Sequence, residues 1–159
     1  MNPKSFLETV VAPNIEDFHN NFSSLRHAHN AISSLDALAA HLYCWAVANS
    51  PNVVASAIGD SGYRNELAER NGSFKLLRDI AKAQKHVHLK YHNPQVKRAD
   101  QVTSRNMGWG DGGYGQGRSG GGEQVIVNDN NGQLHYVEEI VDSSLNLLIS
   151  EMRELGADN

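Results

Sequence analysis

One segment of the sequence, LRDIAKAQKHVHL over residues 77–89, has side chains suited to acid–base chemistry on a phosphate. In a helix, Asp79, Lys82 and His86 lie within about 60° of one another. Arg78 lies at the edge of the same face. A histidine can move the proton of a ribose 2′-hydroxyl while a guanidinium or ammonium group holds the scissile phosphate. The segment therefore predicts Arg78, Asp79 and His86 as catalytic residues for metal-free RNA cleavage, and the alternative is a solvated basic face.

The order of these residues resembles that of a known family. An Arg, a following polar residue and a His further along the same helix, set in a small helical bundle, resemble the HEPN family, with Arg78, Asp79 and His86 in these positions. The resemblance implies a dimeric, metal-independent ribonuclease of a toxin or defence system, without a cofactor. Seven residues separate Arg78 from His86, more than in the family, so their directions differ by about 80° on a helix. The wider order of segments also resembles uncharacterised bacterial proteins, which implies no activity.

Positive charge is concentrated in one part of a chain that is acidic as a whole. Between Lys75 and Arg98 there are seven Lys or Arg residues and one acid, so this part carries +6 and the rest −10 of the net −4. The lysines Lys75, Lys82 and Lys85 are predicted to bind the phosphates of RNA. The alternative is a structural or protein-interaction module, in which these lysines neutralise the acidic last helix or bind an acidic protein partner.

Residues 108–122 form a glycine-rich segment, in which nine of fifteen residues are glycine. Ordering so much glycine costs too much backbone entropy for a helix or strand, so we expect a flexible loop. Its Trp109, Tyr114 and Arg118 could stack on unpaired bases while the basic helix holds phosphates. The alternative is a loop that is only flexible.

The eight histidines do not predict a metal site. His27 and His29 are two residues apart, as are His86 and His88, so each pair points to opposite sides of a helix and cannot chelate. His88 and His92, four residues apart, could chelate, but the other histidines do not complete a site, so we expect no metal and no cofactor. Asp36 and His29 lie at positions of the regular apolar spacing where apolar residues are expected. They predict a polar contact inside the bundle, because a buried polar group needs a hydrogen-bond partner.

Hydrophobic periodicity predicts a mainly α fold, a helical bundle with a small β-hairpin inserted before the C-terminal helix. Apolar residues recur at steps of three and four from Asn14 to Asn49, which predicts one long helix or two in line. Ser73 is expected to cap an amphipathic helix from Phe74 to about Tyr91.

The second half of the chain contains the expected hairpin and the last helix. Two β-type runs flank a turn signal at residues 129–132, which predicts a hairpin over residues 124–137. The last helix is expected over residues 138–155, with Gly156 as its C-cap.

Length and composition favour a single domain over residues 1–159. The single cysteine, Cys44, cannot form an internal disulfide bond, which favours a reducing compartment. The N-terminus lacks the basic and apolar regions of a secretory signal, and no apolar run of about 20 residues is evident, so we expect a cytoplasmic protein without a membrane span. The HEPN resemblance adds the expectation of a homodimer.

Overall fold

The structure is a computed structural model that describes residues 1–89, 93–106 and 122–158. The fold is mainly α, as predicted. The α-helices are α1 (Pro3–Phe6), α2 (Ala12–Asn20), α3 (Leu25–Asn49), α4 (Gly59–Arg70), α5 (Gly72–His86) and α6 (Val137–Leu155). A π-helical segment, η1 (Leu7–Val11), joins α1 to α2, and η2 (Pro51–Val54) and η3 (Ala99–Gln101) are short 3-10 helices. The strands are β1 (Val102–Asn106), β2 (Glu123–Asn128) and β3 (Leu134–Tyr136), an antiparallel sheet in the order β1-β2-β3 that precedes α6.

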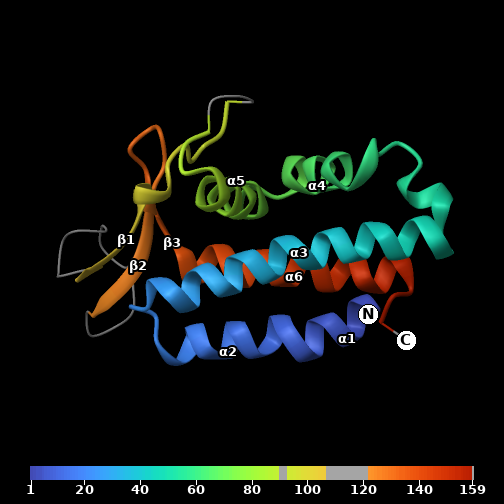
Figure 1. Ribbon diagram of the computed structural model, residues 1–159, viewed down its shortest axis with the longest axis horizontal. Coiled ribbons are helices and arrows are strands. Elements are labelled where there is room, and N and C mark those ends of the chain that lie inside the picture. Colours follow the sequence, from blue (N-terminus) through green and yellow to red (C-terminus); the bar gives the residue numbers. More distant parts are fainter. Residues whose placement is uncertain (90–92, 107–121, 159) are drawn as a thin grey trace.

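Helix α3 is the centre of the bundle (Figure 1). It packs against α2, α4, α5 and α6, and the sheet lies at one end of these helices. Large apolar side chains of several helices are fully enclosed in the core, among them Phe18 of α2, Leu35 of α3, Phe74 of α5 and Leu148 of α6. By length and composition alone α3 could also cross a membrane, but half of its most apolar stretch is buried inside the bundle. A helix at the centre of a protein core passes the same test.

The prediction of one continuous or collinear helix from Asn14 to Asn49 is wrong. Helix α2 ends at Asn20, and α3 begins at Leu25 and runs back alongside α2. The Ser24 side chain caps α3 by accepting a hydrogen bond from the backbone N–H of His27 at 3.3 Å. The chain therefore reverses at residues 21–24, between α2 and α3, although the spacing of apolar residues continues from one helix into the other.

The basic helix differs from its predicted bounds at both ends. Its N-cap is Asn71, whose side chain accepts from the Phe74 N–H at 2.9 Å, and not Ser73. The helix ends at His86, because Val87 has a φ of 62°, a conformation that a β-branched residue rarely adopts. Beyond it, the Leu89 N–H donates to the Lys97 carbonyl at 2.7 Å, so the chain pairs with residues 97–98 instead of continuing the helix.

The sheet confirms the hairpin and adds a strand that the sequence did not predict. Strands β2 and β3 pair as expected, and β1 pairs with the other edge of β2, with Val102 opposite Val127. The last helix also agrees with its prediction within one residue. Its C-cap, Gly156, has a φ of 66°, the left-handed conformation that favours glycine.

Candidate nucleic-acid interface

The polar residues of α5 separate into exposed and buried groups. Lys75, Lys85 and His86 are exposed, and Lys82 is half-buried. In contrast, Arg78 is 3% exposed and Asp79 is 8% exposed. Helices α3, α4 and α6 all pack against α5, so only part of the face that a helical wheel shows as polar remains open to solvent.

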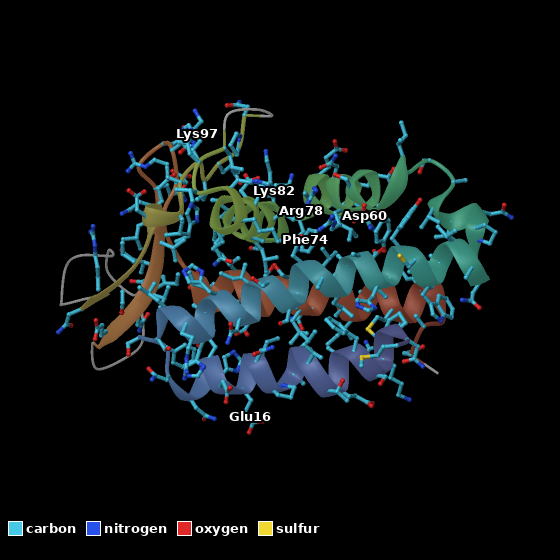
Figure 2. The ribbon with its side chains drawn as sticks, viewed as in Figure 1. Glu16, Asp60, Phe74, Arg78, Lys82 and Lys97 are labelled. Carbon is cyan, nitrogen blue, oxygen red and sulfur yellow. The ribbon has the colours of Figure 1, made fainter. Side chains whose placement is uncertain are left out.

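Arg78 belongs to a charged cluster between α3, α4 and α5, which we define as Asp36, Asp60, Arg64, Asn65, Arg78 and Lys82. Figure 2 shows Arg78, Lys82 and Asp60 in the region between α5 and α4. One terminal nitrogen of Arg78 donates to Oδ1 of Asn65 at 2.5 Å. Arg64 bridges the two aspartates, with N–O distances of 2.8 Å to Asp36 and 2.6 Å to Asp60. The expected internal contact of Asp36 is therefore an ion pair with α4.

Burial controls the ionisation of the two α5 cations in this cluster. It lowers the pKa of Arg78, while the carboxylates of Asp36 and Asp79 oppose that shift. Burial also lowers the pKa of Lys82, and the positive charge of Arg78 adds to the effect. Two guanidinium nitrogens of Arg78, Nε and the second terminal nitrogen, are buried and have no hydrogen-bond partner in the described parts of the chain. Arg78 is thus held by one hydrogen bond and by longer-range attraction to carboxylates.

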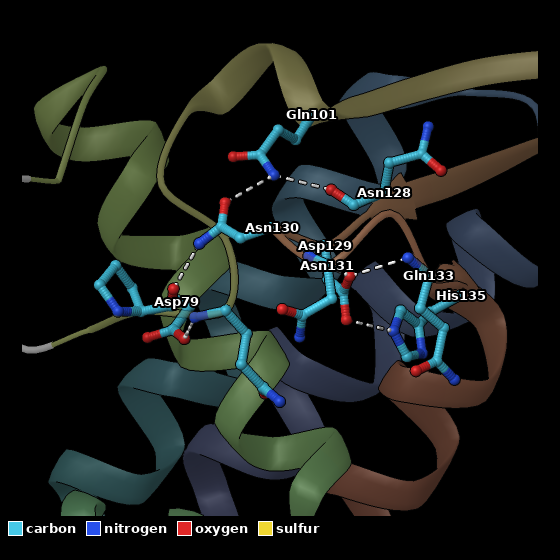
Figure 3. A network of polar contacts seen from close by, with 10 residues as sticks. Asp79, Gln101, Asn128, Asp129, Asn130, Asn131, Gln133 and His135 are labelled. Carbon is cyan, nitrogen blue, oxygen red and sulfur yellow. Dashed lines mark hydrogen bonds and ion pairs between the residues drawn. The ribbon is translucent and has the colours of Figure 1, made fainter.

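Asp79 faces the β-hairpin and not His86. Its carboxylate accepts a hydrogen bond from the Gln95 backbone N–H at 2.7 Å (Figure 3). The Gln95 carbonyl in turn accepts from the backbone N–H of Asn130, in the turn between β2 and β3, at 2.8 Å. Burial raises the pKa of Asp79, an effect opposed by this Gln95 hydrogen bond and by Lys82. These contacts give Asp79 the role of attaching the hairpin turn to α5.

The hairpin turn contains a second enclosed carboxylate, Asp129. Its side chain accepts from the backbone N–H groups of Asn131 at 2.8 Å and Gln133 at 2.9 Å, and it lies 3.3 Å from Nε2 of His135 (Figure 3). Burial by itself would raise the pKa of Asp129, but these hydrogen bonds outweigh it and lower the pKa below its ordinary value. The charged form of Asp129 therefore stabilises this turn.

The three residues predicted as catalytic do not form one contact network. Arg78 contacts Asn65 and Asp79 contacts Gln95, whereas His86 is exposed at the last position of α5. Among residues 1–89, 93–106 and 122–158, no hydrogen bond or ion pair joins His86 to Arg78 or Asp79.

The aromatic and basic residues predicted for base stacking, Trp109, Tyr114 and Arg118, lie outside the described residues. Arg64 and Asn65, the α4 residues of the charged cluster, were missed by the sequence reasoning. The four-residue spacing of Asp60 and Arg64 is the signal that could have found them.

The histidines of the described residues have separate environments. His19 pairs with Asp142 at 2.9 Å, and the His41 ring stacks on Phe6 with centroids 4.1 Å apart. Within the described ranges, no group of three or more His, Cys, Asp or Glu side chains is placed to hold a metal ion.

His29 gives the first testable prediction. This α3 side chain is half-buried, its Nδ1 has no hydrogen-bond partner among the described residues, and burial lowers its pKa below 6.5. Between that lowered pKa and 6.5, the unfolded chain binds more protons than the folded chain, so the free energy of unfolding falls as the pH is lowered. We expect the loss between pH 7.5 and 5.5 to be smaller for His29→Gln than for wild type in urea titrations. Exposed His86→Gln is the control, and an equal loss in all three proteins would contradict the prediction.

Comparisons with protein-family models, with curated proteins and with solved structures find no match for this chain. The functional argument therefore depends on the geometry of the described residues. Its clearest features are the exposed lysines of α5 and the charged cluster between α3, α4 and α5.

Proposed function

We propose that this protein is an RNA-binding helical module that contacts phosphates through the exposed side of α5. The observation that carries the proposal is that the ammonium groups of Lys75 and Lys85 are available to a partner. Both are exposed, and neither forms an ion pair with a carboxylate in the part of the chain that the structure describes. Exposed, unpaired ammonium groups can release the counterions of a nucleic acid, which supplies most of the non-specific binding energy.

Further positive charge lies at the C-terminal end of the same helix. Pairing of His88 with Arg98 brings residues 97–98 beside the end of α5, and Lys97 is exposed there (Figure 2). Arg98 is also exposed, although it pairs with the exposed Asp100 at 2.8 Å. This surface extends the positive face of α5 beyond the last helical turn and favours an extended polyanion as the partner.

In the described part of the chain, the acidic side chains of α6 form no ion pair with the lysines of α5. The described ion pairs of α6 join Glu151 to Arg70 and Asp142 to His19, and neither involves a lysine of α5. This arrangement supports binding of a partner outside the chain.

Binding is tested by fluorescence anisotropy with a labelled single-stranded RNA. We expect the double variant Lys75→Glu/Lys85→Glu to bind at least about tenfold more weakly at low salt. Removing two phosphate contacts should also reduce the salt dependence, log K against log salt, by about 1.4. Lys4→Glu is the matched control, because Lys4 is exposed on α1, on the opposite side of α3 from α5. No binding at low salt, or equal binding by the double variant and wild type, would contradict the proposal.

The HEPN-like ribonuclease hypothesis is a separate part of the proposal. The RNA is incubated without metal with wild type and with His86→Ala, and cleavage is followed on a gel. Cleavage by wild type that His86→Ala abolishes would support catalysis. Intact RNA with both proteins would leave a binding module without catalysis.

A non-enzymatic role is the second candidate, and the burial of Arg78 and Asp79 favours it. In that case α5 docks an acidic protein segment. The test compares the affinity for RNA with the affinity for a polyglutamate peptide of equal charge. Equal affinities for the two in wild type, together with an equal loss of affinity for both in the double variant Lys75→Glu/Lys85→Glu, would favour this candidate. Preference for RNA would favour the first.

A further inference from the structure

The positive side of α5 is covered in its middle. Four cations recur along this helix at steps of three and four residues, and so they lie on one side of it: Lys75, Arg78, Lys82 and Lys85. The two at the ends, Lys75 and Lys85, are exposed, whereas Arg78 is buried and Lys82 is half-buried. Helix α4 provides cover at Arg78, since the Asn65 side chain of α4 accepts its hydrogen bond (Figure 2).

The contact that covers Arg78 leaves hydrogen-bond donors unused. Its partner Asn65 is an uncharged amide that accepts from one terminal nitrogen. Nε and the second terminal nitrogen of Arg78 are buried without a partner in the described ranges, and so is Nε of Arg64 on α4. A buried donor that has lost water without gaining an acceptor is costly. The closed position of α4 is therefore less stable than a fully paired interface would be.

Helix α4 is also held by few buried side chains. Two of its twelve residues, Tyr63 and Leu67, are buried, compared with eight of the fifteen residues of α5. At its first residue, Gly59 has a φ of 73°, a conformation open to glycine, so the chain can change direction there. Segments with few buried contacts open locally at a lower free energy than the core does. We therefore expect α4 to open before the rest of the bundle.

Contacts with α6 keep α4 closed in the free protein. The Tyr63 hydroxyl donates to the Glu151 carboxylate at 2.9 Å, and Arg70 pairs with the same carboxylate at 2.8 Å. Because opening breaks these contacts, it needs a partner that binds the open form more tightly than the closed form. A polyanion meets this condition. The unused Nε and terminal nitrogen of Arg78 share one edge of the guanidinium group, which can donate two parallel hydrogen bonds to phosphate oxygens.

We propose that α4 is a lid over α5, closed in the free protein, which moves away when a polyanion binds and thereby adds Arg78 and Lys82 to the exposed lysines. This inference rests on the proposed function for the identity of the polyanion, which is RNA. Lys75 and Lys85 make the first contacts, and opening of α4 completes a continuous row of four cations.

Amide hydrogen exchange of the full chain tests the lid without RNA. In the free protein, we expect residues 63–70 of α4 to exchange at least about tenfold faster than the core helices α3 and α6. Inorganic polyphosphate, a polyanion without bases, should speed exchange of residues 63–70 at least about threefold further and leave α3 unchanged. Equal protection of α4 and α3, or no acceleration by polyphosphate, would overturn the proposal.

A variant that strengthens the closed contact gives a second test. Asn65→Asp offers Arg78 a charged acceptor, so exchange of residues 63–70 should slow about tenfold and polyphosphate should no longer speed it. Asn146→Asp is the matched control, because it adds the same charge at an exposed position of α6. Exchange of α4 that is as fast in Asn65→Asp as in Asn146→Asp would refute the lid.

The outcomes separate the lid from the proposed function. Acceleration of α4 exchange by polyphosphate, without binding of RNA, would keep the lid and refute the RNA module. Binding of RNA that leaves the exchange of residues 63–70 unchanged would refute the lid alone.

Discussion

Replacing Arg78 with alanine is expected to lower the free energy of unfolding by about 3 kcal/mol. Arg78 is enclosed between α3, α4 and α5, and its charge offsets the nearby carboxylates of Asp36 and Asp79. Without it, these carboxylates lose a compensating charge inside the protein, Asn65 loses its hydrogen-bond donor and a large side chain leaves a space.

Urea titration followed by circular dichroism measures this loss. Lys85→Ala, on the exposed side of the same helix, is the control and should change stability by less than about 0.5 kcal/mol. Arg78→Lys keeps the charge but not the forked geometry, so it should fall between alanine and wild type. A loss below about 0.5 kcal/mol for Arg78→Ala would show that the charged cluster does not stabilise the bundle and would reopen a catalytic role for this residue.

Glu151→Ala is expected to lower the free energy of unfolding by about 3 kcal/mol. The Glu151 carboxylate on α6 is 6% exposed and accepts from the Tyr63 hydroxyl at 2.9 Å and from Arg70 at 2.8 Å, both on α4. Removal leaves the buried Tyr63 hydroxyl without its partner. Burial and the Glu151 charge also raise the pKa of Tyr63, so the hydroxyl stays a donor over the whole range of ordinary pH.

The matched control is Glu154→Ala, because Glu154 is exposed on the same helix. Glu151→Gln keeps an acceptor for Tyr63 and should cost less than alanine. A thermal or urea unfolding series of the three variants measures the order. If Glu151→Ala and Glu154→Ala have equal stability, then the contact between α6 and α4 contributes nothing measurable.

Much of the architecture could be predicted because local signals and tertiary packing agree there. The last helix combines a regular apolar stripe with a glycine at its C-cap, and the hairpin combines β-branched runs with a turn sequence. Both are found as predicted. Strand β1 was missed because its sequence, VTSRN, has little apolar character and forms a strand only through pairing with β2.

The helix boundaries show where local patterns were insufficient. The spacing of apolar residues continues from α2 into α3, since both helices contribute to one core, and only the capping by Ser24 marks the reversal. Similarly, α5 ends eight residues before Pro94, where the chain begins to pair with residues 97–98. That pairing joins residues eight to ten positions apart, so the propensities of the residues near the end of α5 do not encode it.

The candidate site was predicted only in part, for a comparable reason. A helical wheel predicts one polar face on α5, but it cannot say which residues of that face another element will cover. Helix α4 supplies Arg64 and Asn65 over Arg78, whereas no described carboxylate pairs with Lys75 or Lys85. The position of α4 therefore decides which charged residues of α5 are buried, such as Arg78, and which stay exposed to solvent, such as Lys75 and Lys85.

The central place of α3 also affects how the chain can fold during synthesis. Helix α6 packs against both α3 and α5, yet it is made about a hundred residues after α3 begins. Until α6 leaves the ribosome, the apolar surfaces of α3 and α5 that it covers stay open to chaperones or to association with other nascent chains. A translational pause or a premature stop before residue 137 would therefore leave an incomplete, aggregation-prone bundle and not a smaller stable one.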